Sequence, residues 1–120
     1  MKDRNYLEEN GVDVQTGLDL LGDMDMYNET CEDFLNEINE KYPNAKAYKE
    51  AGDMPNYAIL VHSIKSDSKY LGFTRLAELA YEHELKSKEN DIDFVNNNFA
   101  SLEEEIKRII NVVKTYLGKE

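Results

Sequence analysis

The chain has 120 residues, 41% of them hydrophobic, and its 25 acidic and 14 basic side chains give a net charge of -11. This length suits one domain with a single core, and we treat residues 1–120 as one domain. Such a negative field repels phosphate backbones and anionic headgroups, which argues against nucleic acid or a membrane surface as a partner. The single cysteine, Cys31, excludes an internal disulfide and a cysteine-based zinc site, and it fits a reducing compartment.

Hydrophobic spacing indicates the fold class. Apolar residues recur at intervals of three and four, and no segment alternates apolar and polar residues over the length of a strand. No apolar run approaches the ~20 residues that a membrane-spanning helix needs, and the stretch MKDRNYLEEN lacks the apolar segment of a signal peptide. We therefore expect an all-α protein in the cytoplasm, without a membrane segment.

Two short helices are predicted at the N-terminus. The first covers residues 3–9 and is closed by the pair Asn10-Gly11, and the second covers residues 14–21 and is closed by Gly22.

A longer helix is predicted to start at Asp23. We expect Pro43 to bend or break it, because proline disfavours helical geometry in the residue before it. The continuation of the helix ends at Gly52. Its predicted apolar positions are Met26, Tyr27, Phe34, Leu35 and Ile38.

A helical hairpin is predicted over residues 54–89. Asp53 can cap its first arm, with Pro55 near the first-turn position where a missing N–H has no consequence. Gly72 ends this arm, and the second arm runs from Phe73 to about Glu89.

The last predicted helix is capped by Asp91 and continues to Gly118. The chain thus contains four substantial helices with short connections. We predict an antiparallel up-down four-helix bundle with short additional N-terminal helices, and we expect it to be a monomer.

The first arm of the hairpin carries His62 on the side opposite its apolar residues. At about 100° per residue, Lys65, Ser66 and Lys69 follow the histidine on the same side, where they can meet a bound anion. Ala58 and Ile59 lie within about 60° of the histidine and form an apolar shoulder that suits a transient docking partner.

A histidine such as His62 suits reversible phosphoryl transfer, because an unperturbed imidazole, with a pKa of about 6.5, offers a neutral, nucleophilic nitrogen near neutral pH. Such transfer needs little beyond in-line positioning and charge neutralisation, which a helix face can provide if the partner brings a metal ion. Helical spacing alone leaves another interpretation open, in which His62 is simply a solvated surface residue.

The order of residues in VHSIKSDSKYLGFTRLAELAYEHE favours the functional interpretation. This stretch resembles the core of histidine phosphotransfer domains, in which a histidine, a lysine three positions later, several small residues, an aliphatic residue and a glycine follow in order. A looser resemblance extends over about residues 11–117. The matching positions are His62, Lys65, Ser66, Ser68, Leu71 and Gly72.

The resemblance implies a role for each of these residues. His62 would be the phosphoacceptor and Lys65 the neighbour of the phosphate, while Ser66 stands where the family mostly has glycine and either narrows access or supplies a hydroxyl. Glu84 stands where the phosphoacceptor domain of chemotaxis kinases has a glutamate that orients the histidine. Asp67 departs from the usual small residue and needs a partner or an exposed route.

The resemblance also implies the biochemical context. The chain would be a phosphoryl carrier rather than a stand-alone enzyme, with response-regulator receiver domains and a sensor or hybrid histidine kinase as partners. No cofactor is expected in this chain, whereas Mg²⁺ is expected in the partner receiver domain. From the helix face and the resemblance taken together, the residues expected to contribute to binding are Ala58, Ile59, Ser66, Lys69 and Gly72.

Several alternatives remain open. His83 is expected to be structural, partly buried and hydrogen-bonded, and a metal site built on both histidines lacks the usual ligand spacings. Glu84 could instead be a solvent-facing residue paired with Lys88. The bundle as a whole could be an adaptor or inhibitor that binds receiver or kinase domains without being phosphorylated, or a plain structural module.

Overall fold

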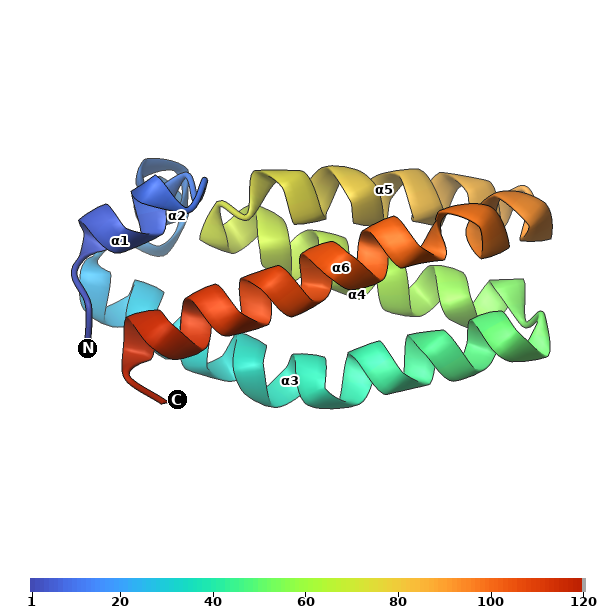
Figure 1. Cartoon of the computed structure of the whole chain (residues 1–120). Helices are drawn as coiled ribbons and strands as arrows, with labels where there is room; N and C mark the ends of the chain where they lie inside the picture. Colours follow the sequence, from blue (N-terminus) through green and yellow to red (C-terminus); the bar gives the residue numbers. More distant parts are fainter. Residues whose placement is uncertain (120) are drawn as a thin grey trace.

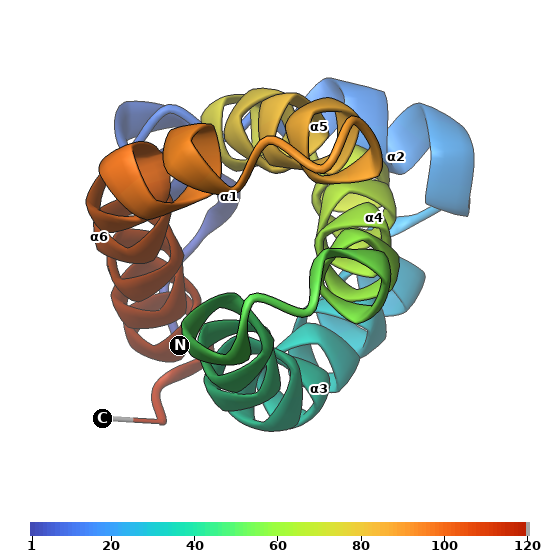
Figure 2. The same ribbon diagram turned by 90° about the vertical axis from the view of Figure 1, so that its right-hand side faces the viewer.

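The computed structural model describes residues 1–119 and consists of helices. The helices are α1 (Arg4–Glu9), α2 (Val14–Leu21), α3 (Met24–Ala51), α4 (Met54–Leu71), α5 (Thr74–Lys88) and α6 (Ile92–Leu117). Figure 1 shows α3, α4, α5 and α6 running antiparallel to their neighbours, and Figure 2 shows them arranged around a common axis in chain order. The predicted all-α, up-down four-helix bundle with short N-terminal helices is confirmed.

Side chains of aspartate begin five of these helices. Each carboxylate accepts a hydrogen bond from a backbone N–H in the first turn, which satisfies a donor that has no partner within the helix. The capping residues are Asp3, Asp13, Asp23, Asp53 and Asp91. These caps explain why the helix boundaries agree closely with those expected from the sequence.

Helix α3 runs without interruption through Pro43. The prediction was a bend or a break at Pro43, and the break is wrong. A proline inside a helix removes one backbone hydrogen bond and costs ~3 kcal/mol or more. Ile38 and Ala45, on either side of it, are buried in the core, and Lys41 pairs with Asp67 of α4 at 2.6 Å. Packing of both halves of α3 against the bundle outweighs the local preference.

Large apolar and aromatic side chains fill the bundle. Phe34 and Phe73 pack edge to face with ring centroids 5.1 Å apart, and the buried hydroxyl of Tyr27 donates a 2.7 Å hydrogen bond to the carbonyl of Leu71. Met26, predicted to be in the core, is exposed instead. The neighbouring Tyr27 occupies the inward position of that turn.

The turn between α4 and α5 holds α2 in place. Gly72 has a φ of 80°, and its carbonyl accepts a 2.8 Å hydrogen bond from the N–H of Asp13. A Cβ atom on Gly72 would lie 2.0 Å from the carbonyl oxygen of Asp13. Only glycine therefore fits, and α2 is fixed at one end of the α4–α5 hairpin. Over residues 1–119, no helix is both long enough and apolar enough to span a membrane.

Candidate functional site

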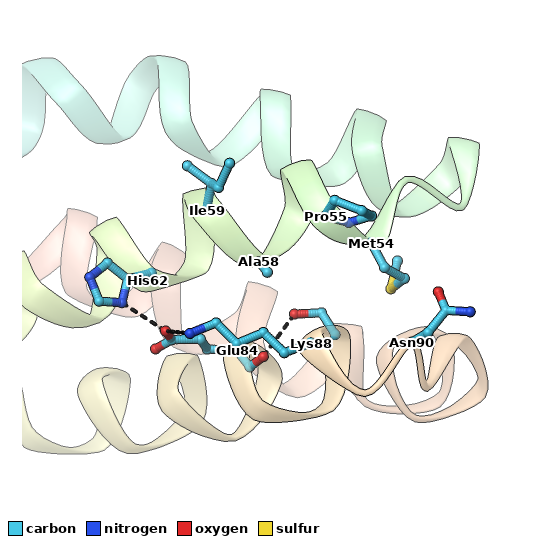
Figure 3. A pocket seen from close by; sticks show the side chains of 9 residues that line it. Met54, Pro55, Ala58, Ile59, His62, Glu84, Lys88 and Asn90 are labelled. Atoms are coloured by element: carbon cyan, nitrogen blue, oxygen red, sulfur yellow. Dashed lines mark hydrogen bonds and ion pairs between the residues drawn. The ribbon is translucent and has the colours of Figure 1, made fainter.

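The antiparallel hairpin of α4 and α5 brings His62 opposite Glu84. The Nδ1 atom of His62 lies 2.7 Å from Oε2 of Glu84, and the side chain of His62 is 56% exposed. The expectation that His62 is exposed is therefore met. Because an ionised carboxylate can only accept, Nδ1 carries the proton and Nε2 keeps its lone pair. Figure 3 shows Nε2 pointing away from Glu84 and toward the C-terminal end of α4.

Glu84 is a buried anion with three donors. Its side chain is only 3% exposed. Besides the contact with His62, Oε1 accepts a 2.6 Å hydrogen bond from Nζ of Lys65, and Oε2 accepts a 2.8 Å hydrogen bond from Nζ of Lys88. Burial would raise the pKa of this carboxyl, but the hydrogen bonds from Lys65, Lys88 and His62 outweigh it and lower the pKa to about 2. The solvent-facing alternative for Glu84 is wrong, although its pairing with Lys88 exists.

Lys65 is held in place rather than free at the surface. Its side chain is 13% exposed, its ammonium is bound to Glu84, and it lies 5.1 Å from the centroid of the Tyr81 ring. The helical wheel predicted that Lys65 can meet a bound anion beside His62, but it does not include this ion pair, because the wheel describes α4 alone and the buried charge comes from α5. Lys69 is exposed, and within residues 1–119 it forms no ion pair.

A groove of about 610 Å³ opens beside His62, between the N-terminal half of α4 and the C-terminal end of α5 (Figure 3). Ile59 is 65% exposed on its rim, whereas Ala58 is only 5% exposed. The predicted shoulder is therefore half correct, because Ala58 packs toward α5 and lines the groove instead of standing above the surface. The lining residues are Met54, Pro55, Ala58, Ile59, His62, Glu84, Ser87, Lys88 and Asn90.

Sequence reasoning identified Glu84 but missed the rest of the groove wall that the C-terminal end of α5 contributes. In the hairpin, His62 faces Glu84, Lys65 faces Tyr81, and Ala58 shares the groove with Lys88. The two residue numbers add to the same total in each pair, as expected for antiparallel helices. Extending this register from a single assumed pair would have placed Lys88 beside Ala58.

Three other predicted residues have different surroundings. Ser66 is half-buried on α4, next to Asp67, whose carboxylate accepts a 2.6 Å hydrogen bond from Lys41 of α3. That contact supplies the partner that Asp67 was expected to need. Gly72, predicted to bind a partner, is buried where Asp13 covers it. Its requirement for glycine comes from packing against α2. Gly72 also lines a second groove with Lys69 and Tyr81, and its binding role stays a prediction.

The second histidine, His83, is fully buried. Its Nδ1 lies 2.7 Å from the hydroxyl of Tyr57, and its ring packs edge to face on Phe94. Burial lowers the pKa of His83 to about 4, against a smaller raising effect from a backbone hydrogen bond with Asn98. His83 is thus structural, as predicted, and more deeply placed than the bundle edge. Among residues 1–119, no group of three or more metal-ligating side chains comes together.

Comparison with known proteins places this geometry in a family. The family model described as Hpt domain matches residues 24–112, which extend from α3 through most of α6 and include both His62 and Glu84. No curated protein and no solved structure matches the chain. Proteins with this domain take part in histidine phosphotransfer within phosphorelays, as carriers of the phosphoryl group. The matched region covers more than half of the chain, which therefore belongs to the histidine-containing phosphotransfer (Hpt) domain family.

Proposed function

We propose that His62 accepts a phosphoryl group from a receiver-domain aspartate and passes it to another receiver or returns it. The observation that carries this proposal is an exposed imidazole whose Nδ1 proton is bound by the buried carboxylate of Glu84. That bond selects one tautomer and leaves Nε2 as the nucleophile. Glu84 acts as a positioning residue, because it touches the imidazole and not the phosphoryl group.

In the transfer step, the lone pair of Nε2 attacks the phosphorus atom of the aspartyl phosphate. The bond between phosphorus and the aspartate oxygen breaks, its electron pair stays on that oxygen, and the aspartate is left as a carboxylate. His62 keeps the proton on Nδ1 and becomes a phosphorylated imidazolium. Its positive charge faces the carboxylate of Glu84 at 2.7 Å, which stabilises this product. The reverse step uses the same atoms.

Transfer also requires a metal ion and a docking contact, both of which involve the partner receiver domain. This chain supplies a nucleophile, and we propose that the receiver domain brings the Mg²⁺ ion that neutralises the phosphoryl oxygens during transfer. The groove between Met54 and Asn90 would receive an apolar part of the receiver, with Ile59 as the exposed contact. We further propose that the protein works as a monomer in the cytoplasm, where sensor or hybrid histidine kinases supply the phosphate through their receivers.

The proposal is tested by incubating the protein with a receiver domain that carries a radiolabelled aspartyl phosphate in the presence of Mg²⁺. We expect acid-labile label on the wild type and none on His62→Gln. His83 remains in that variant and serves as an internal control for labelling of the other histidine. Label that persists in His62→Gln would refute the assignment. Binding of the receiver without any labelling of the wild type would instead support a non-phosphorylated adaptor.

A further inference from the structure

Two lysines that share Glu84 with His62 are already engaged. Lys65 and Lys88 bind opposite oxygens of Glu84, and Glu84 is buried. If either lysine moved to a phosphoryl group, the buried carboxylate would lose one of its three donors, and removing a partner from a buried charge is destabilising. Lys65 is further restrained by its contact with the ring of Tyr81. The charge of a phosphorylated His62 therefore needs another cation.

The direction of Nε2 limits where that cation can be. Lys88 lies on the groove side of the imidazole, and Figure 3 shows Nε2 directed the other way, along α4 toward its C-terminus. A phosphoryl group attached to Nε2 would thus extend over the turns of α4 that follow His62.

Ser66 and Lys69 lie on those turns. Their offsets of four and seven residues place them within about 40° and 20° of His62 around the helix axis, and Lys69 is about 10 Å along that axis. Helical side chains lean toward the N-terminus, so the side chain of Lys69 leans back toward His62. Its four-carbon stem gives the ammonium reach and freedom, and Lys69 has no ion pair within the described chain.

We propose that the hydroxyl of Ser66 and the ammonium of Lys69 hold the phosphoryl group on Nε2 of His62, while Lys65 stays bound to Glu84. Ser66 donates a hydrogen bond to a phosphoryl oxygen, and Lys69 supplies the neutralising charge. No proton is transferred and no further bond is formed. The inference rests on the proposed phosphorylation of His62. It assigns a function to Ser66, which stands where the family mostly has glycine.

The inference is tested with the phosphorylated protein itself. The first measurement is the equilibrium distribution of the phosphoryl group between the receiver and this chain. The second is the pKa of the phosphoryl group on His62, obtained from a pH titration of its ³¹P NMR resonance. The variants are Lys69→Gln, Lys69→Arg, Ser66→Ala and Lys65→Gln. The control is Lys107→Gln, which removes one positive charge, as Lys69→Gln does, from an exposed position of α6. We expect Lys69→Gln to shift the equilibrium toward the receiver by about threefold, as for an exposed ion pair, and to raise the pKa of the phosphoryl group.

Lys69→Arg should restore both values, Ser66→Ala should shift the equilibrium in the same direction as Lys69→Gln, and Lys107→Gln should resemble the wild type. If Lys69→Gln resembles Lys107→Gln, while Lys65→Gln raises the pKa of the phosphoryl group, the assignment to Lys69 is overturned and the proposed function stands. A wild type that takes no label at all would overturn the proposed function and, with it, this inference.

Discussion

Replacing Glu84 by glutamine tests whether the buried carboxylate prepares His62 for transfer. Glutamine keeps the shape of the side chain but removes the charge that His62, Lys65 and Lys88 share. A hydrogen bond to a charged group contributes about 1.5–3 kcal/mol. Water reaches His62, whose side chain is 56% exposed, so we take the lower end, which corresponds to about a tenfold loss of the Nδ1-protonated tautomer.

We therefore expect Glu84→Gln to accept phosphate from a receiver about ten times more slowly than the wild type. The matched control is Glu82→Gln, which removes the same charge from an exposed position of α5. A second measurement, the ¹⁵N shifts of the His62 ring in the unphosphorylated protein, reports the tautomer directly and would not respond to a merely structural role. Unchanged shifts together with an unchanged transfer rate would refute the positioning role of Glu84.

Three further predictions concern stability and docking. Gly72→Ala should lower the free energy of unfolding in urea more than Gly11→Ala, which has nearly the same φ but open space around it. We expect a difference of about 1–3 kcal/mol from the clash at Gly72, and equal losses would contradict the tight packing of α2. His83 stays neutral in the folded chain down to about pH 4, whereas an unfolded histidine binds its proton near pH 6.5. The unfolded state therefore takes up this proton first, and burial of His83 lowers stability as the pH falls from 6.5 toward 4, by up to about 3 kcal/mol. Unfolding curves between pH 6.5 and 4.5 should show a smaller decline in His83→Gln, and parallel curves would argue against a neutral buried ring. Ile59→Asp should weaken receiver binding about tenfold with unchanged thermal stability, as expected for an exposed apolar contact; unaltered affinity in a titration would place docking elsewhere.

The sequence predicted the helices well because their ends depend on local chemistry. Asp53 and Gly72 cap α4, and Asp23 and Gly52 cap α3 in the same way. Pro43 was misjudged for the opposite reason. Its effect on α3 is decided by contacts with other helices, such as the pair of Lys41 and Asp67, which no local pattern contains.

The site was predictable in its residues but not in its electrostatics. Helical spacing identified His62 as exposed, and the family resemblance pointed to Glu84. The burial of Glu84 and its capture of Lys65 depend on how α4 and α5 pack, and a wheel drawn for α4 alone cannot represent a charge on α5. For the same reason Ala58 was expected on the surface and lines the floor of a groove.

The central claim is that Nε2 of His62 carries the phosphoryl group. The most direct measurement is a ¹H–¹⁵N long-range correlation spectrum of the protein after transfer from a phosphorylated receiver. We predict that the His62 ring shows a proton on Nδ1 and coupling between phosphorus and Nε2, while the resonances of the His83 ring stay unchanged. Phosphorus coupled to Nδ1 of His62, or to either nitrogen of His83, would contradict the account.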